Sequence, residues 1–177
     1  MKLKKTILII GSGVEQVEAY KICKKLKLTI VALDKNHKAP CLKFADYYIK
    51  ASNRNLNECI KKISAFNKKK KIDAFFSVGT DTTILQYKIS KLLGLKFITN
   101  KSAQISTNKI KMKNFFKTNK INTPKFKFVN KLLHIYKFAK KNNFPIVLKP
   151  HDGRGAEGVL KINNINDLNK YKKFYFK

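Results

Sequence analysis

The sequence predicts an α/β fold built on a parallel sheet. Short apolar runs, typical of buried parallel strands, recur through the first hundred residues. Between them, apolar residues recur every three to four positions, as on one face of a helix. With 44% hydrophobic residues among 177, the chain also has enough apolar side chains for a sizeable core. The alternating order favours parallel strands joined by right-handed crossovers.

The first region contains five predicted strands, at residues 6–10, 28–33, 47–49, 72–78 and 96–98. Three helices are predicted between them, each from a set of apolar residues that would share one face. These sets are Ala19, Ile22, Cys23 and Leu26, then Leu56, Cys59, Ile60 and Ile63, and finally Leu85, Ile89 and Leu92.

Capping residues mark the ends of the second and third helices. Asn55 is followed by Glu58 three residues later, which predicts a capping box. Asp81 is suited to cap the start of the third helix, and Gly94 is suited to end it.

The pattern changes near residues 100–107, which predicts a first domain over 1–105 and a second over 106–177. In the second region we expect a helix over 108–119, a strand over 126–129 and a helix around 132–139. Strands at 145–149 and 159–162 would then flank a glycine-rich turn, residues 151–158. A further helix begins near 166–173.

The formal net charge is +30, from 40 Lys and Arg against 10 Asp and Glu, which suggests a nucleic-acid partner. Two features disfavour that interpretation. Arg54 and Arg154 are the two arginines, although arginine is preferred for specific base and phosphate recognition. The lysines are spread along a chain rich in Asn, Ile and Phe, as an A+T-rich coding background would produce. Nucleic-acid binding is therefore the less favoured alternative.

Cysteine and hydropathy patterns predict a cytoplasmic protein. Cys23, Cys41 and Cys59 lie far apart without metal-ligand or disulfide spacing, so we expect buried, reduced thiols. The three histidines are equally scattered, and we expect no metal site in this chain. No apolar run approaches the roughly 18–20 residues of a membrane span. The short apolar run after the basic N-terminus lacks the features of a signal peptide.

A Gly-x-Gly segment follows the first predicted strand. Gly11 and Gly13 open a helix, and Asp34 lies about twenty residues later, as in a dinucleotide-binding fingerprint. Gln16 stands where that fingerprint has its third glycine. We therefore interpret the segment as a structural turn, which could face a substrate, rather than as an NAD(P) site.

A second candidate site lies at the end of the fourth predicted strand. Gly79, Thr80 and Asp81 precede a helix, and ligands of open α/β sheets bind at the carboxyl ends of strands. Helix N-termini also hold anions. Together with Gly11 and Gly13, these residues form a possible substrate or anion site, although an ordinary helix cap is the favoured explanation of residues 79–83.

The strongest chemical signal is the segment from Lys149 to Gly158. The predicted strand ends at Lys149 and leads into a turn with three glycines. The backbone amides of such a turn can approach phosphate oxygens, and the lysine supplies positive charge. Arg154 adds a planar donor. The order of residues is not that of a P-loop.

Lys149-Pro-x-Asp-Gly-Arg-Gly-Ala-x-Gly-Val resembles the glycine-rich loop of ATP-grasp enzymes, in their carboxylate–amine ligase and carbamoyl-phosphate-synthetase-like branch. The stretch from Thr107 to Pro124 is similar to the family's DK…MK…GIPxP segment, although Asn108, Lys120 and Asn122 depart from it.

The first hundred residues resemble the family's Rossmann-like pre-ATP-grasp domain, including the segment around Gly11 and Gly13, Ala45-Asp46-Tyr47 and the helix after Gly79. The similarity covers essentially the whole chain. It implies the first part of an ATP-grasp domain over residues 106–177.

The resemblance implies ATP bound between two lobes. Lys109 and Lys149 would contact the nucleotide, and five residues would cover its phosphates, namely Gly153, Arg154, Gly155, Ala156 and Gly158. Enzymes of this family convert a carboxylate and ATP into an acyl phosphate, which an amine or similar nucleophile then attacks. The carboxylate at Glu157 departs from what a phosphate-covering loop favours, so we expect it to face solvent.

The family's acidic Mg²⁺ ligands lie well beyond the glycine loop, and after Glu157 this sequence has Asp167 as its one acidic residue. We therefore expect the N-terminal portion of a longer ligase, completed by a separately encoded C-terminal half or associated as a homo-oligomer. Its partners would be ATP and a small carboxylate. Two alternatives are a non-catalytic small-molecule or anion-binding α/β module and a lysine-rich nucleic-acid-binding protein.

Overall fold

The computed structural model describes residues 4–153 and 155–175, with side chains placed as far as residue 171. The chain divides into two compact units, residues 1–104 and 105–177. Among the described residues, no helix combines the length and apolar character needed to cross a membrane.

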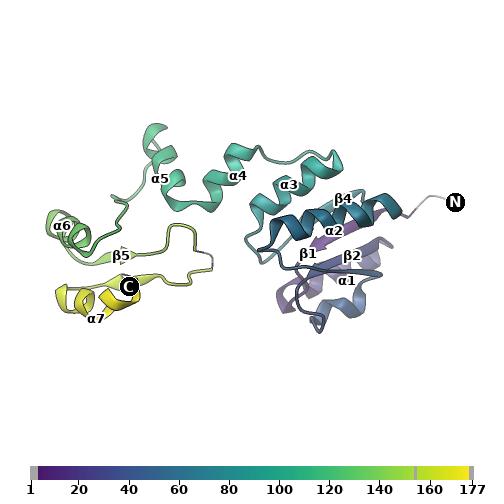
Figure 1. Ribbon diagram of the computed structural model, residues 1–177, viewed down its shortest axis with the longest axis horizontal. Coiled ribbons are helices and arrows are strands. Elements are labelled where there is room, and N and C mark those ends of the chain that lie inside the picture. The colour runs from purple at the N-terminus through teal and green to yellow at the C-terminus, as the bar shows by residue number, and fades with distance from the viewer. Residues whose placement is uncertain (1–3, 154, 176–177) are drawn as a thin grey trace. The chain divides into compact units, whose positions relative to one another are not determined.

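A four-stranded parallel sheet forms the centre of the first unit (Figure 1). Its strands lie in the order β3-β2-β1-β4 and consist of β1 (Thr6–Ile10), β2 (Thr29–Asp34), β3 (Tyr47–Lys50) and β4 (Ala74–Ser77). The nearly complete burial of β1 and β2 follows from their continuous apolar sequences, because both faces of the sheet are covered. The predicted α/β parallel-sheet fold is confirmed.

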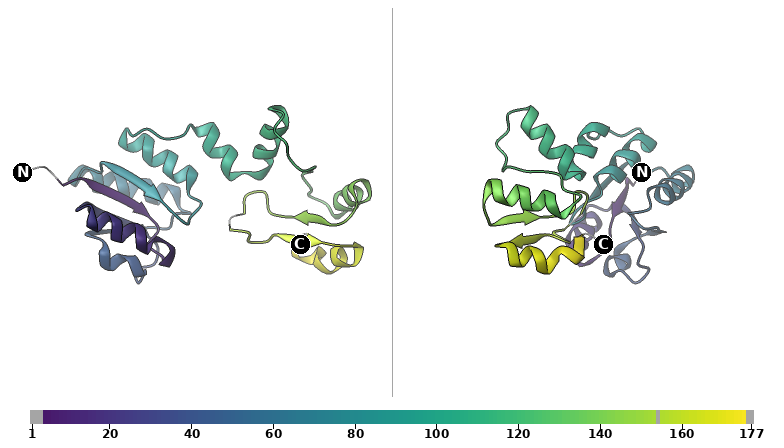
Figure 2. Two further views of the ribbon diagram at one scale, coloured as in Figure 1. Left: turned by 180° about the vertical axis from the view of Figure 1, so that it is seen from behind. Right: turned by 60° about the vertical axis from the view of Figure 1, so that its left-hand side comes forward.

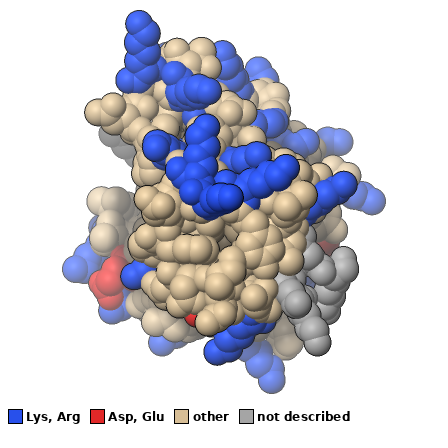
Figure 3. All heavy atoms as spheres, turned by 90° about the vertical axis from the view of Figure 1, so that its left-hand side faces the viewer, with Lys and Arg blue, Asp and Glu red and all other residues tan. Residues whose placement is uncertain are grey.

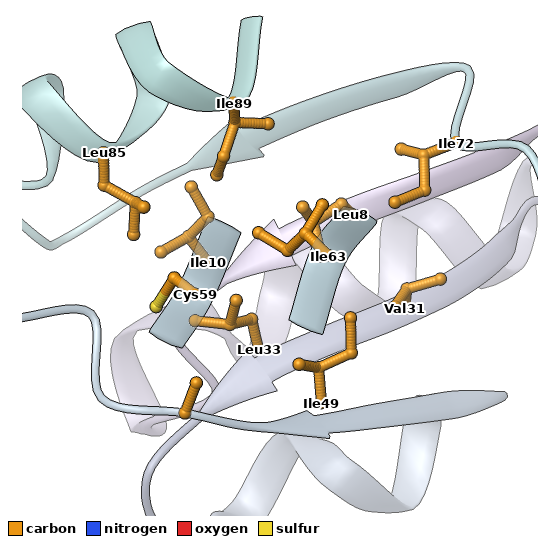
Figure 4. Packing of buried hydrophobic residues seen from close by; sticks show 11 residues of the cluster. Leu8, Ile10, Val31, Leu33, Ile49, Cys59, Ile63, Ile72, Leu85 and Ile89 are labelled. Atoms are coloured by element: carbon orange, nitrogen blue, oxygen red, sulfur yellow. The ribbon is translucent and has the colours of Figure 1, made fainter. Parts of the chain in front are cut away.

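Helices cover both faces of this sheet. The helices α2 (Leu56–Lys69) and α3 (Thr83–Leu93) pack on one face, and α1 (Val17–Lys25) packs on the other with the short η2 (Pro40–Phe44) (Figure 1). Figure 4 shows Cys59 and Ile63 of α2 pointing onto the strands. Each large apolar side chain fully buried here contributes about 1.5–3 kcal/mol relative to exposure.

The second unit is built on an antiparallel pair, β5 (Ile146–Leu148) and β6 (Leu160–Ile162), with α6 (Leu132–Asn142) and α7 (Ile165–Tyr175) packed against one face (Figure 2). Ile135 and Ala139 of α6 meet Ile146, Ile162 and Leu168 in a small core. The helix α5 (Lys109–Thr118) also belongs to this unit, and α4 (Asn100–Thr107) spans the division between units.

Two predicted strands are wrong, and one helix was not predicted. Within the described residues, 96–98 and 126–129 pair with no other strand. Phe97 lies against Phe75, with ring centroids 5.5 Å apart, and Val129 packs on the core of the second unit. The weakly patterned α4 occupies the segment where we placed only a boundary.

The predicted inner face of the first helix is also partly wrong. Ile22 and Leu26 are 54% and 65% exposed, whereas Tyr20 and Cys23 are buried. The Tyr20 hydroxyl lies 2.9 Å from Ser12 Oγ and donates to the Gly11 carbonyl, so these hydrogen bonds hold Tyr20 inward. Burial in turn raises the pKa of Tyr20.

The capping predictions are correct for Asn55 as an N-cap and for Gly94, and wrong for Asp81. The predicted capping box is not completed, because the Asn55 backbone amide donates to the Ser52 carbonyl and not to Glu58. Asn55 Oδ1 accepts from the Glu58 amide, and Gly94 ends α3 with φ of +66°. The residue at the N-cap of α3 is Thr82, whose hydroxyl donates to Ser77 Oγ, while Asp81 is exposed.

Candidate functional site

The glycine-rich turn joins β5 to β6 in a conformation that requires its glycines. Gly155 and Gly158 have φ values of 56° and 71°, and Ala156 between them has φ of 60°, in the left-handed region. At Gly153 an added Cβ would lie 3.1 Å from Pro150 Cβ and 3.3 Å from the Glu157 carbonyl. The turn is therefore too tightly closed at Gly153 to admit a side chain without adjustment.

Lys109 lies directly against this turn although it is 44 residues earlier in the sequence. Its backbone amide donates to the His151 carbonyl at 2.8 Å, and its Nζ donates to the Gly153 carbonyl at 2.6 Å. The second unit thus brings together Lys109 and the first half of the turn, two segments that the family resemblance assigns to the nucleotide.

Asn108 fixes where Lys109 begins helix α5. Its Oδ1 accepts from the amides of Ile110 and Lys111, both at 3.0 Å, as an N-cap residue does. Asn108 was noted in the sequence as a departure from the family's aspartate. Because asparagine also caps helices well, the departure retains the local structure.

Lys149 follows β5 by one residue and is exposed. Side chains alternate along a strand, so Lys149 shares the outer face of β5 with Val147, which is 59% exposed, rather than the inner face with Ile146 and Leu148. Glu157 is exposed, as predicted. Arg154 lies outside the described residues.

The groups in the second unit match the chemistry of phosphate. Two ammonium groups, Lys109 and Lys149, lie at or beside a turn whose left-handed residues orient backbone amides. Two exposed carboxylates, Asp152 and Glu157, also belong to the turn, and the Asp152 carboxylate lies 3.6 Å from His151 Nδ1. The arrangement could hold a polyphosphate through the lysines and the glycine amides.

The first unit holds the other predicted site residues at the carboxyl edge of its sheet. The Gly11 amide donates to the Leu33 carbonyl, the Ser12 amide to Asp34 Oδ2, and the Gly13 amide to Gln16 Oε1. These three amides therefore already have acceptors within the chain. The geometry is that of a structural turn, with Gln16 filling the space beside the glycines.

Gly79 and Thr80 lie close to the same turn. Thr80 Cγ2 would be 3.6 Å from a Cβ added at Gly11, and Thr80 Oγ1 accepts from Asn53 Nδ2 at 3.4 Å. The fold thus gathers Gly11, Gly79 and Thr80, while the exposed Asp81 lies beside them in sequence. Anion binding at this edge stays a prediction.

Two features of the first unit were missed in the sequence. Gln16 Nε2 donates to the Val78 carbonyl at 2.7 Å, and Ser77 Oγ accepts from both Thr82 and Gln86. The available signal for Gln16 was a polar residue in a position that favours glycine. Among the described residues, no group of three or more His, Cys, Asp or Glu side chains is arranged to hold a metal ion.

Lysines occur along the whole chain and are not confined to the site. Figure 3 shows one face of the molecule, with many Lys and Arg side chains, few acidic ones and broad areas without charge. The lysines near the glycine-rich turn are therefore distinguished by their contacts and not by charge alone.

Comparisons with known proteins agree with this fold. The PylC-like N-terminal domain family matches residues 7–93. Formate-dependent phosphoribosylglycinamide formyltransferase from Prochlorococcus marinus (strain MIT 9312) is 29% identical over 172 residues, covering 94% of this chain and 42% of the relative. The chain thus spans less than half the length of this curated relative.

Two solved structures have the same fold. One is an N5-carboxyaminoimidazole synthetase from Staphylococcus aureus complexed with ADP, with a TM-score of 0.74 and 21% sequence identity. The match covers 98% of this chain and 46% of the synthetase chain. The other is an L-amino acid ligase from Bacillus licheniformis, with a TM-score of 0.79 and 16% sequence identity. The match covers 98% of this chain and 43% of the ligase chain.

The fold and these similarities show the class of proteins to which the chain is related. The chain is a relative of the ATP-grasp carboxylate–amine ligases and corresponds to their N-terminal part. The family resemblance seen in the sequence is confirmed.

Proposed function

We propose that this chain is the ATP-binding portion of an ATP-grasp ligase that activates a small carboxylate as an acyl phosphate. The observation that carries the proposal is the contact between Lys109 and the glycine-rich turn at Gly153, because it joins two segments that the family resemblance assigns to the nucleotide. The ADP complex of a protein with the same fold supports a nucleotide ligand.

In this proposal the second domain, residues 106–177, binds the phosphates. Lys109 and Lys149 neutralise phosphate charge, and the backbone amides of Gly153, Gly155, Ala156 and Gly158 donate hydrogen bonds as the turn closes over the nucleotide. Arg154 belongs to the same proposed set. The rate enhancement would come from positioning the phosphates and neutralising their charge, the two effects that dominate catalysis of phosphoryl transfer.

The reaction follows from the family. A carboxylate oxygen attacks the γ-phosphorus and ADP leaves. The nitrogen of an amine then attacks the acyl carbon, and phosphate leaves. The relative's name, a formate-dependent formyltransferase acting on a glycinamide, supports a small carboxylate and an amine as substrate classes. The first domain, residues 1–105, would contribute the substrate site through Gly11, Gly13, Gly79, Thr80 and Asp81.

We assign Mg²⁺ to no residue described here, since no suitable ligand cluster occurs among them. The metal-binding groups of the activity would belong to polypeptide beyond these residues, continuous with it or encoded separately, or to an assembly with a second copy. The proposed setting is the cytoplasm, where ATP is available.

Thermal unfolding with and without ATP tests the proposal. ATP at a hundred times its Kd stabilises a folded chain by about 2.7 kcal/mol, a shift of several degrees in Tm. We expect that shift in the unmodified chain and in a Lys161→Ala control on β6, and its loss in Lys149→Ala. No shift in the unmodified chain would contradict nucleotide binding. An unchanged shift in Lys149→Ala would contradict the site.

A further inference from the structure

We propose that Lys109 is a positioning residue that orders the glycine-rich turn before any nucleotide binds. Its ammonium and its backbone amide both hold the first half of the turn. This inference rests on the proposed function only for its last step, the arrival of a phosphate.

The attachment has two points on one residue. The Lys109 amide donates to the His151 carbonyl at 2.8 Å, and Lys109 Nζ donates to the Gly153 carbonyl at 2.6 Å. The second bond has a charged donor and lies in a part-buried environment, so it is stronger than a neutral hydrogen bond at the surface. Both acceptors are carbonyls of the turn, which fixes its backbone directly.

Both sides of this contact are held in place by other interactions. On the helix side, Asn108 caps the first turn of α5, and the Met112 amide donates to the Asn108 carbonyl at 2.9 Å. On the turn side, the His151 ring packs edge-on against Phe128, with centroids 6.2 Å apart. Preordered partners lose little conformational entropy when the bond forms, so the contact should persist in solution.

The same ammonium remains able to bind a phosphate. A lysine ammonium has three N–H donors, and the Gly153 carbonyl uses one of them. The carbonyl therefore holds the charge at the turn while two donors remain for phosphate oxygens. A nucleotide that engages Lys109 would further immobilise the turn, so nucleotide binding and turn order should reinforce each other.

Hydrogen exchange of the full chain, without nucleotide, tests the positioning role. We expect Lys109→Met, which keeps the length of the side chain but lacks donors, to speed exchange of the residue 109 amide, which donates to the His151 carbonyl, about tenfold. Tenfold is the lower end for a hydrogen bond from a charged donor. Lys109→Arg should retain most of the protection, and Lys161→Met on β6 should leave it unchanged. Exchange in α6, which packs in the core of the same unit, is the internal check that the variants fold.

Equal exchange in Lys109→Met and the unmodified chain would overturn the proposal, as would an equal effect from Lys161→Met. A repeat with ATP separates this inference from the proposed function. If ATP protects no variant while the Lys109→Met difference persists, nucleotide binding fails and the positioning role stands. If ATP protects the turn equally in Lys109→Met and the unmodified chain, the reinforcement between turn and nucleotide is overturned.

Discussion

Gln16 and Val78 are joined across the turns that follow β1 and β4, by a 2.7 Å hydrogen bond from Gln16 Nε2 to the Val78 carbonyl. Gln16 Oε1 also accepts from the Gly13 amide at 2.7 Å. One side chain, 5% exposed, therefore binds two backbone groups from different turns and fixes the carboxyl edge of the sheet.

Gln16→Ala should lower the free energy of unfolding by about 1–3 kcal/mol, because a part-buried donor and a part-buried acceptor lose their partner. Urea unfolding measures the change. Lys21→Ala on α1, the helix that follows Gln16, is the matched control. It breaks an exposed ion pair with Glu18, so the cost should stay below about 1 kcal/mol. Equal effects in the two variants would show that the Gln16 bridge contributes no stability.

Gly79→Ala should destabilise the chain more than Gly94→Ala. Both glycines have positive φ, +64° and +66°, so both variants incur backbone strain, of about 1 kcal/mol. An added Cβ at Gly94 has no described neighbour within 4 Å, whereas at Gly79 it would lie 3.0 Å from Gln16 Nε2 and still nearer to Glu15 Oε2. The Gln16 bridge must therefore shift in Gly79→Ala.

A double-mutant cycle checks this explanation. Gln16→Ala combined with Gly79→Ala should cost less than the sum of the single changes, since the bridge can be lost only once. Strict additivity would mean that the two positions act independently, contrary to the geometry.

The Asp46 carboxylate should make the first unit more stable at neutral pH than in acid. Burial raises its pKa, but hydrogen bonds from Lys24 Nζ and the Ile30 amide, both 2.8 Å, and the lysine charges lower it below the ordinary 3.8. A folded-state pKa below the unfolded value gives stability that is present above the unfolded pKa. This stability is lost as pH falls through the folded pKa.

Urea unfolding of the unmodified chain and Asp46→Asn over a pH series measures this contribution. Asp46→Asn should be the less stable variant at neutral pH, and the difference should shrink as the pH drops below 3.8. A difference that stays constant down to the lowest pH would contradict the role of the ionised carboxylate.

The three cysteines should react with thiol reagents only after unfolding. Cys41 and Cys59 are fully buried and Cys23 is 5% exposed, and burial raises the pKa of Cys59 to about 11. Little thiolate is then present near neutral pH, and the reagent cannot reach it. Alkylation followed by mass measurement should find native chains unlabelled when urea-treated chains carry three labels. Rapid native labelling at Cys59 would contradict the packing of α2.

The parallel sheet was predictable because its strands are continuous apolar runs that need no knowledge of their partners. The runs at 96–98 and 126–129 look alike in sequence, but a strand also requires a neighbouring edge, which periodicity does not reveal. The exposure of Ile22 depends similarly on the hydroxyl partners of Tyr20, which come from the preceding turn.

The candidate site was predictable in its parts and not in its assembly. Glycine content and a strand-borne lysine marked the 149–158 segment, and the family resemblance added Lys109. The bond between Lys109 and Gly153 spans 44 residues and depends on how α5 packs, so no local pattern encodes it. Gln16 was seen as a missing glycine, while its bridging role depends on Val78, far along the chain.

Backbone NMR of the isotopically labelled full chain, titrated with ATP, tests the central claim most directly. We predict saturable shifts in the amides of Lys109 and of the 149–158 segment, with smaller changes at the β1 and β4 turns. Shifts concentrated at residues 79–83 would instead favour an anion-binding first unit. No saturable shift at millimolar ATP would contradict a nucleotide site in this chain.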